Sequence, residues 1–535
     1  MPASYDLIVI GGGHNGLVTA AYAARAGLKV LVLERREVLG GACTTEELWP
    51  GFKVSTAAYV NSLLRPEIIR DLELKRHGFA MLPRSPSSFT PFPDGRYLLL
   101  GPDKDLTYRE VAKFSARDAA ALPKYEAMLE RVALFIEPTL IQTPPTPWSL
   151  APGNLVQLAK LGLGFARLGK DAVRAVEVLT GAARPILDRW FESEQLKVTL
   201  ATDAIIGAFA SPSMPGTAYV LFHHVMGECD GARGVWGYVR GGMGGISSAI
   251  AAAAREKGAE IRTNAPVARI LIRDGAAGGV VLEDGTELSA TRVASGVDAH
   301  VTFLNLVDPS ELPPEFVADV RAIDYASASL KINLALSAVP NFTALPGGQP
   351  GPQHRGTIHL CPTLDYIEEA YDDAKHGRAA RNPIVEATIP SVLDDTVAPK
   401  GMHVMSMFTQ YFPYDIREGS IDYWKERYAD RCIEIMDQYA PGFSQSVVHR
   451  QVLSPRDLEA RFGLTGGNIM QGAMSLSSLS FMRPVAGYAD YRTPIRGLYL
   501  CGAATHPGGG VMGACGYNAA REILKDAGRR LRTAA

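Results

Sequence analysis

One turn, residues 11–16, constrains the fold of this chain more than any other segment. It reads Gly-Gly-Gly-His-Asn-Gly and follows the apolar run 6–10, which is typical of a buried parallel strand. The small-residue stretch 17–27 predicts a helix that ends at a glycine, and a second apolar run, 29–33, ends at Glu34. Strand, glycine turn, helix, strand and terminal acid together form the G-x-G-x-x-G dinucleotide fingerprint.

Each part of this fingerprint has a physical role. Gly11 permits the tight turn, Gly13 lets a pyrophosphate approach the backbone, and Gly16 lets helix and strand pack closely. The helix N-terminus offers free N–H groups to phosphates, and Glu34 would accept hydrogen bonds from ribose hydroxyls. The cofactor-binding residues predicted from this segment are Gly11, Gly13, His14, Asn15, Gly16 and Glu34.

The residues after Glu34 favour FAD over NAD. A glycine pair, Gly40-Gly41, resembles the second FAD signature of glutathione-reductase-like and amine-oxidase-like flavoproteins, although a solvated loop is the alternative. Disulphide reductases of this fold carry a redox cysteine pair here, but Leu48 stands where the second cysteine is needed, so we expect Cys43 to be a packed small residue. The predicted cofactor contacts in this stretch are Arg35, Gly40, Gly41 and Thr44.

A second glycine-rich site lies near the end of the chain. The apolar run 498–501 predicts a strand, and it is followed by Gly502, the loop 505–510 and a helix from about Met512. A helix N-terminus behind a glycine loop is an anion or carbonyl site. Because it recurs so far from the first turn, we expect the FAD domain to be assembled from separated segments.

Length and composition limit the remaining choices. A chain of 535 residues suggests two domains, and a net charge of −2 gives no support for nucleic-acid binding. The six cysteines are scattered without zinc spacing, so we expect no metal site and a reducing, cytoplasmic location. The first strand starts by Asp6, which leaves no room for a signal peptide, and no apolar run is long enough to span a membrane.

Between the two glycine sites the periodicity changes several times. We expect a hairpin over 92–100, a helix over 106–135 and then a loop that begins at Pro138. The segment 154–180 is apolar with a basic bias, and it predicts a helix that lies either in a membrane interface or on its own domain. The run 330–336 predicts a strand.

These motifs match a known family. The fingerprint over 11–45, the stretch 240–244, the stretch 389–399 and the ending 498–510 resemble the phytoene desaturase-related flavoproteins, and among them the desaturase-type β-carotene ketolases. The resemblance covers nearly the whole chain. It implies an α/β fold: a glutathione-reductase-like FAD-binding Rossmann domain built from separated segments, interleaved with a substrate domain made of a sheet and a helical cap.

The resemblance also implies roles for single residues. The adenosine and pyrophosphate half of FAD would lie against residues of the first segment and Val267, and the flavin half against the C-terminal loop. The residues added to the cofactor site in this way are Val267, Gly502, Gly510, Val511 and Met512. The expected FAD domain comprises 1–75, 237–300 and 485–535, and the substrate and cap domain comprises 76–236 and 301–484.

The implied reaction is hydride transfer between a hydrophobic small molecule and the flavin, with oxygen or a quinone as electron acceptor. Flavin performs the difficult electronic step, so the protein orients the substrate and excludes water. A carotenoid ketolase or desaturase is one alternative, and a redox-quiet flavoprotein that works as a binding or scaffold module is another. A peripheral membrane contact and the oligomeric state stay open.

Two residues are candidates for catalysis. Lys331 lies mid-strand, and a lysine on a comparable strand of flavin amine oxidases holds a water against the flavin. The alternative is a lysine on the solvent face, since alternation puts Leu330 and Ile332 together on the other face. His506 lies in the flavin-side loop, where it would hydrogen-bond the ring or substrate or be an ordinary loop histidine.

Overall fold

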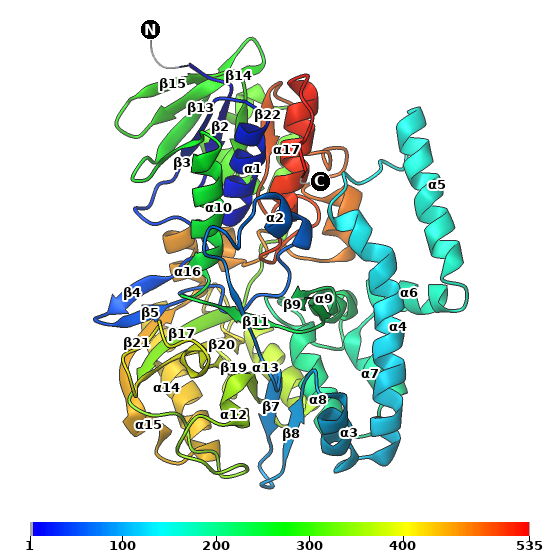
Figure 1. Ribbon diagram of the computed structural model, residues 1–535, viewed down its shortest axis with the longest axis vertical. Coiled ribbons are helices and arrows are strands. Elements are labelled where there is room, and N and C mark those ends of the chain that lie inside the picture. The colour runs from blue at the N-terminus through cyan, green and yellow to red at the C-terminus, as the bar shows by residue number, and fades with distance from the viewer. Residues whose placement is uncertain (1–3, 230, 534–535) are drawn as a thin grey trace.

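The computed structural model describes residues 4–229 and 231–533. One part, at the top of Figure 1, is built on a parallel sheet with the strand order β12-β3-β2-β16-β22. Its strands come from three stretches that lie far apart in the sequence. They are β2 (Leu7–Ile10), β3 (Val30–Leu33), β12 (Glu260–Arg262), β16 (Val293–Ser295) and β22 (Leu498–Leu500).

Side-chain alternation divides the parallel sheet into two packed faces. Leu7 and Val9 pack with helices on one face, whereas Ile8 and Ile10 pack on the other against a second, smaller sheet. The helices are α1 (His14–Arg25), α10 (Gly244–Glu256) and α17 (Ala514–Asp526). The smaller sheet contains β1 (Ser4–Tyr5), β13 (Val267–Arg273), β14 (Ala276–Leu282) and β15 (Glu287–Ala290). This arrangement confirms the predicted Rossmann-type fold.

The lower part of the molecule is a large mixed sheet, with the order β21-β17-β20-β19-β18-β7-β8 (Figure 1). Leu330, Ile332 and Leu334 pack in its apolar core together with residues of α13 and α14, so the face that carries Lys331 turns the other way. The strands are β7 (Ser88–Pro91), β8 (Tyr97–Leu100), β17 (Ser329–Leu336), β18 (Thr357–Leu360), β19 (Ile384–Thr388), β20 (His403–Gln410) and β21 (Val447–Leu453). The helices named here are α13 (Leu364–Lys375) and α14 (Ile421–Tyr439).

A helical cap covers the β7–β8 side of the large sheet. The helix expected over 106–135 is two helices, and Pro138 lies in the last turn of the second instead of starting the loop. The helix expected over 154–180 is also two, because Gly169 adopts a positive φ of 56° between them. The cap helices are α3 (Lys104–Ala112), α4 (Ala116–Leu140), α5 (Pro152–Arg167), α6 (Asp171–Thr180), α7 (Ala183–Trp190), α8 (Glu194–Ala201) and α9 (Thr217–Val225).

Shorter elements connect these layers. The strands are β4 (Glu46–Trp49), β5 (Phe52–Val54), β6 (Met81–Pro83), β9 (Glu228–Cys229), β10 (Ala232–Arg233) and β11 (Gly237–Val239). The helices are α2 (Pro66–Asp71), α11 (Pro314–Arg321), α12 (Pro352–Arg355), α15 (Phe443–Ser446) and α16 (Pro455–Phe462).

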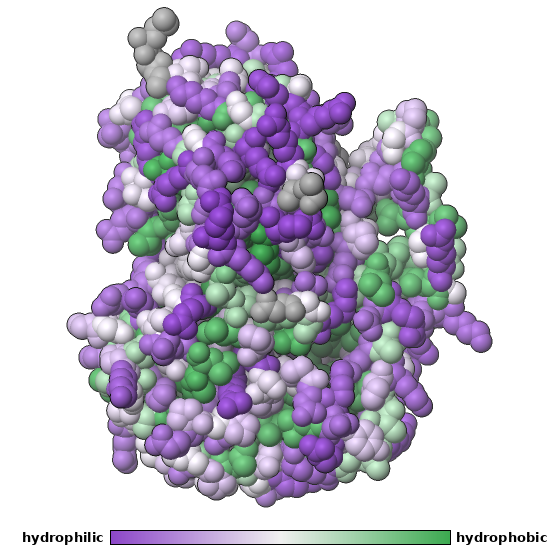
Figure 2. All heavy atoms as spheres, in the orientation of Figure 1, coloured by the Kyte–Doolittle hydropathy of each residue, from purple (hydrophilic) through white to green (hydrophobic). Residues whose placement is uncertain are grey.

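Helix α5 stands away from the body of the molecule (Figure 1). No residue of α5, all of which the structure describes, is buried, and Leu155, Val156 and Leu163 are each about half exposed. Figure 2 shows apolar and polar side chains mixed along this arm. Within residues 4–229 and 231–533, no helix is long and apolar enough to cross a membrane.

Candidate functional site

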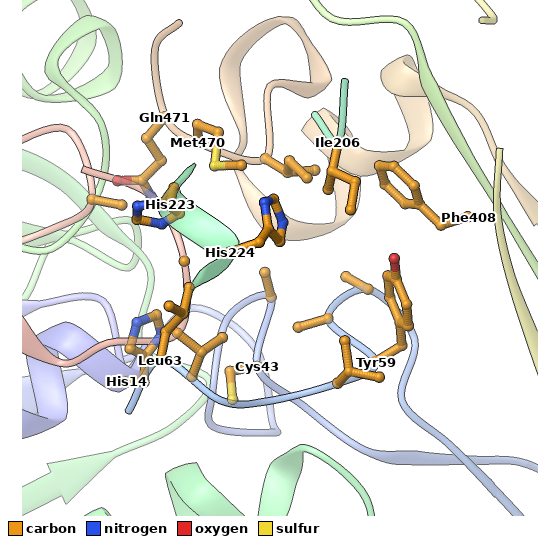
Figure 3. A pocket seen from close by; sticks show the side chains of 18 of the residues that line it. His14, Cys43, Tyr59, Leu63, Ile206, His223, His224, Phe408, Met470 and Gln471 are labelled. Carbon is orange, nitrogen blue, oxygen red and sulfur yellow. The ribbon is translucent and has the colours of Figure 1, made fainter. Parts of the chain in front are cut away.

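A single cavity of about 1190 Å³ runs from the glycine turn to the large sheet. Its wall includes residues of the parallel-sheet part, of the large sheet and of cap helices α4 and α9. Figure 3 shows His14 and Cys43 on one side of this space, and Tyr59 with Phe408 on another. The predicted cofactor turn and the predicted substrate domain therefore open onto the same space.

The geometry of the glycine turn fits a dinucleotide pyrophosphate. Gly11 has a φ of 93°, and a Cβ on Gly16 would lie 2.3 Å from the Gly11 carbonyl oxygen, so larger residues are excluded at both positions. A Cβ on Gly13 would instead have the Gly40 carbonyl oxygen, 4.0 Å away, as its nearest neighbour. The turn is therefore packed tightly behind Gly13 and open on the cavity side.

The start of α1 is free to bind an anion. Its N-cap residue, Gly13, provides no side-chain hydrogen bond to the first turn, and His14, Asn15 and Gly16 line the cavity. The Glu34 carboxylate, 6% exposed, accepts hydrogen bonds from the backbone N–H groups of Gly12 at 2.8 Å and Arg36 at 2.9 Å. It also lines the cavity, where its remaining lone pairs can accept from hydroxyl groups.

The glycine pair is held directly against this turn. The Gly40 N–H donates to the Gly12 carbonyl at 2.8 Å, and Gly40 and Gly41 both line the cavity. Beside them, the buried Cys43 thiol donates to the Met243 carbonyl at 3.3 Å. Burial raises the pKa of Cys43 to about 12, which keeps it as a thiol and agrees with a packing role.

The C-terminal loop meets the fingerprint helix across the cavity. Gly510 and Val511 line the cavity, and the Gly510 backbone is close enough to the His14 ring to raise its pKa slightly. Burial nevertheless lowers the pKa of His14 to about 4, so this ring is neutral at physiological pH. Arg35 and Val267 also line the cavity, and the Arg35 guanidinium donates to the Ala460 carbonyl at 3.0 Å.

Three predicted cofactor residues lie behind the wall. Thr44 and Met512 are each 1% exposed, and neither they nor Gly502 contributes to the cavity surface. A Cβ on Gly502 would lie 2.4 Å from the Gly296 carbonyl oxygen. Each of the three residues is next in sequence to a residue that lines the cavity. Gly502 itself packs against the backbone of Gly296 and does not reach the cavity surface.

His506 is also absent from the cavity wall, contrary to the expectation that it faces flavin or substrate. Its ring is buried, and Nε2 lies 2.9 Å from the Thr139 carbonyl oxygen at the end of α4. The alternative of an ordinary loop histidine therefore agrees better with its contacts.

Lys331 is in the cavity wall, and the solvent-face alternative is wrong. The residue is only 2% exposed, because both faces of the large sheet are covered. Its Nζ atom lies 4.2 Å from the centre of the Tyr59 ring and donates to the Ser406 hydroxyl. Burial holds the pKa of Lys331 well below its usual range.

Lys331 belongs to a row of side chains that crosses the large sheet. In the strand register, Lys331 is opposite Phe408, Phe408 is opposite Glu386, and Glu386 is opposite His359. All four line the cavity. Tyr59 lies over this row, with its ring stacked 5.8 Å from Phe408, and its hydroxyl and the Glu386 carboxyl group are close enough to shift each other's pKa.

Burial shifts the titration of this row toward neutral forms. It raises the pKa of Glu386 to about 8, helped by the nearby Asp203 carboxyl group, whose own pKa is also raised by burial. Burial, together with the Arg84 cation, lowers the pKa of His359 to about 3. The cavity therefore has a polar wall that carries less charge than its composition suggests.

Sequence reasoning missed most of this polar wall. Glu386, His359, Asp203 and Arg84 belong to four segments whose proximity depends on strand order, which no local pattern reveals. The one available signal was a charged residue inside an otherwise apolar strand, Glu386 within 384–388, which is costly unless it has a partner.

The chain is similar to known flavoproteins over most of its length. The family described as flavin containing amine oxidoreductase matches residues 16–361. Pyridine nucleotide-disulfide oxidoreductase domain-containing protein 2 of Rattus norvegicus is 47% identical, over 98% of this chain and 94% of that protein. The lycopene-forming phytoene desaturase of a Paracoccus species is 23% identical, over 96% of each chain. These relatives confirm the predicted resemblance to phytoene desaturase-related flavoproteins.

Solved structures share the fold. Putrescine oxidase bound to putrescine has a TM-score of 0.59 at 14% identity, covering 98% of this chain and 100% of that one. Cyclohexylamine oxidase of Brevibacterium oxydans has a TM-score of 0.56 at 17% identity, covering 98% and 100%. At these identities the likeness is one of architecture.

Proposed function

Because the chain belongs to the flavin-containing amine oxidoreductase family and is an FAD-dependent oxidoreductase, we propose that it oxidises a hydrophobic small molecule by hydride transfer to the flavin. The observation that supports this most is the continuous cavity, which joins a dinucleotide turn to a wall of the large sheet. A substrate in the second half would meet the flavin end of a cofactor in the first half. FAD supplies the two-electron chemistry when it is bound.

The cofactor would be held mainly by backbone. In this proposal the N-terminus of α1 and the glycines 11, 13, 16, 40 and 41 bind the pyrophosphate, and Glu34 binds the ribose. Arg35 and Val267 would border the adenosine, and Gly510 and Val511 would border the flavin. The corresponding FAD domain is 1–75, 237–300 and 485–535, with 76–236 and 301–484 as substrate and cap domain.

We assign Lys331 a catalytic role beside the reduced flavin. By analogy with flavin amine oxidases, its amine would stabilise the negative charge that develops as electrons pass to oxygen. Its burial in the cavity wall and its low pKa support a group that can take up a proton at that moment. A quinone would be the alternative acceptor.

The protein would work in the cytoplasm, with α5 as a peripheral membrane contact. Residues 138–170 contain no acidic residue and include Lys160, Arg167 and Lys170. Exposed leucines beside these basic residues suit the surface of an anionic bilayer, from which an apolar substrate could be taken.

Anaerobic titration of the bound flavin tests the proposed reaction. Oxidised holoprotein is mixed without oxygen with lipophilic alcohols, amines and polyenes, including β-carotene, and loss of the yellow flavin absorbance is recorded. We expect one of these classes to bleach the flavin as completely as dithionite does. The Gly13→Val protein is the control, since a valine there would extend into the pyrophosphate space and prevent FAD binding. Dithionite bleaching without bleaching by any of the compounds would favour the redox-quiet alternative.

A further inference from the structure

Arg84 is a buried cation in the cavity wall. It follows β6, is 3% exposed and lines the cavity with Ser88 and Thr357. Its Nη1 donates to the Thr357 hydroxyl at 2.7 Å, and its Nε donates to the Trp236 carbonyl at 3.3 Å. These neutral partners fix the guanidinium plane without compensating its charge.

No carboxylate pairs with this guanidinium. Among the residues that the structure describes, no acidic side chain lies within ion-pair distance of Arg84, although Glu386 and Asp203 are near enough to feel its field. Both carboxyl groups have a raised pKa because they are buried, so burial disfavours their charged forms.

The titratable groups nearest to Arg84 on the sheet side, His359 and Tyr59, do not supply a negative charge. The pKa of His359 is lowered and the pKa of Tyr59 is raised well above its usual range, so both are neutral. Lys331 can only add positive charge. Within the part of the chain that the structure describes, Arg84 is therefore a buried cation without an ion pair, and the centre of the Tyr238 ring lies 5.5 Å from its guanidinium.

This charge decides what kind of molecule binds well. A pure hydrocarbon would expel the water that solvates Arg84 and leave a buried cation without a partner, which is costly. A ligand oxyanion would instead accept charge-assisted hydrogen bonds from the guanidinium fork, which suits carboxylates and phosphates. The remainder of a ligand would lie along the apolar wall towards the glycine turn.

We propose that the substrate is an amphipathic anion, an apolar chain that ends in a carboxylate or phosphate group bound by Arg84. This inference rests on the proposed function, because it concerns the substrate half of the same cavity, and it narrows the substrate class. Arg84 acts as a specificity residue and takes no part in hydride transfer.

Binding of short amphiphiles to oxidised holoprotein tests the proposal by isothermal titration calorimetry. The probes are octanoate, octyl phosphate and the uncharged ester methyl octanoate. We expect at least one of the two anions to bind about tenfold to a hundredfold more tightly than the ester. The anion that binds more tightly distinguishes a carboxylate substrate from a phosphate substrate.

Three variants test whether Arg84 causes the preference for the anions over the ester. Arg84→Gln should reduce the preference for the anion to less than about threefold, whereas Arg84→Lys should keep a part of it. Arg96→Gln, which removes an exposed arginine, should keep all of it. If Arg84→Gln fails to fold with FAD, the preference for anion over ester is compared between wild type and Arg84→Lys, and this comparison still tests the proposal.

Two results would overturn the proposal: equal binding of ester and anions by the wild type, or an unchanged preference in Arg84→Gln. No turnover occurs in these titrations. A failure here therefore leaves the anaerobic bleaching result, and with it the proposed reaction, unaffected.

Discussion

Several titratable residues of the cavity wall lie where burial favours their neutral forms. Glu386, Lys331 and His359 share one row of the large sheet and are all buried. Each is shifted toward its neutral form because water is excluded from around it. The folded protein therefore binds protons differently from the unfolded chain, and its stability depends on pH.

Glu386 should make the protein less stable as the pH rises. Its pKa is about 8 in the folded state against 4.5 in the unfolded chain, so its neutral form contributes stability below pH 4.5. That contribution is lost as the pH rises through about 8. We expect the Tm of Glu386→Gln to rise relative to wild type between pH 5 and pH 9, by roughly 1–3 °C. Calorimetry across this range measures it, with the exposed Glu315→Gln as control. Parallel Tm curves for wild type and Glu386→Gln would refute this.

Lys331 should accelerate reoxidation. We expect the Lys331→Met protein, reduced with dithionite and mixed with oxygen in a stopped-flow instrument, to react at least about tenfold more slowly than wild type, because its amine no longer stabilises developing negative charge. Lys53→Met is a matched control, since Lys53 is a strand lysine exposed to solvent. A wild-type rate in Lys331→Met would leave the lysine a structural residue.

At the scale of elements, local sequence patterns predicted the presence of helices and strands better than the points at which one helix ends and the next begins. The strand 330–336 and the fingerprint elements were predicted because one apolar period defines each. The segment 154–180 became α5 and α6, since the glycine between them bends the chain without changing the apolar pattern. The row across the large sheet joins residues 331, 359, 386 and 408, and only the strand order brings them together.

Helix α5 makes the membrane proposal testable. We expect the protein to sediment with phosphatidylglycerol vesicles at low ionic strength and to be released by about 0.5 M salt, which screens its basic residues. Replacing both Leu155 and Leu163 with serine should abolish sedimentation, because about half of each leucine is exposed for insertion. Val448→Ser, on β21, serves as the control.

Absence of wild-type protein from the vesicle pellet at low salt would remove this role for α5. Gel filtration would then compare wild type with the double-serine protein. A wild-type dimer that is lost in the double-serine protein would identify a second copy of the chain as the partner of α5.

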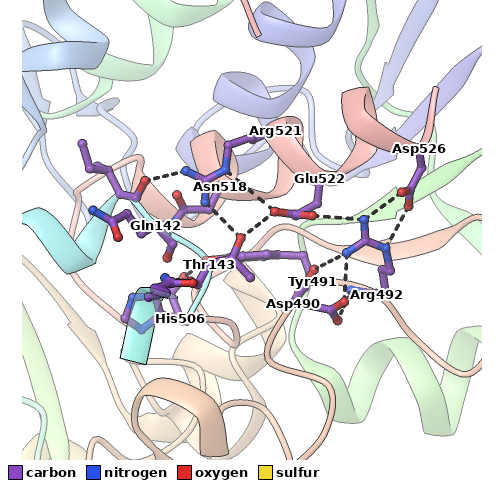
Figure 4. Close-up of polar contacts among 12 residues, drawn as sticks. Gln142, Thr143, Asp490, Tyr491, Arg492, His506, Asn518, Arg521, Glu522 and Asp526 are labelled. Carbon is purple, nitrogen blue, oxygen red and sulfur yellow. Dashed lines mark hydrogen bonds and ion pairs between the residues drawn. The ribbon is translucent and has the colours of Figure 1, made fainter. Parts of the chain in front are cut away.

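At the scale of the whole molecule, two helices from opposite parts of the sequence, α1 and α17, are in contact. Gly516 of α17 contacts α1, where the Thr19 hydroxyl donates to the Gly516 carbonyl at 3.0 Å. The same helix binds the end of α4: Arg521 donates to the Ile141 carbonyl at 2.9 Å, and Asn518 donates to the Leu140 carbonyl at 2.9 Å (Figure 4). Helix α17 therefore joins the fingerprint helix to the cap.

The contact between α1 and α17 should be needed for cofactor retention. A Cβ on Gly516 would lie 2.1 Å from the Asn15 carbonyl oxygen, so Gly516→Val must separate the two helices. We expect the ratio of FAD to protein after gel filtration to fall at least about fivefold, although Gly516 does not line the cavity. Gly162→Val, in α5, is the control, since nothing lies within 4 Å of its Cβ. A full complement of FAD in Gly516→Val would contradict this.

The general architecture could be predicted from the sequence because the residues of the cofactor site lie in short contiguous segments. Gly11, Gly13 and Glu34 lie within one short segment, and the structure places all three on the cavity wall. The substrate half did not follow, because Arg84 and Glu386 are separated by most of the chain and acquire their environment only from tertiary packing.

The strand β22, the helix α17 and the loop between them come from the last 40 residues. The strand completes the parallel sheet, and Ala503, Gly510 and Val511 of the loop line the cavity. A ribosome that adds about 5–20 residues per second needs roughly half a minute to two minutes to make 535 residues. During that time β2, the first strand of the sheet, has no β22 segment to complete its layer. We therefore expect FAD to bind only after this C-terminal segment has been made and has joined the sheet.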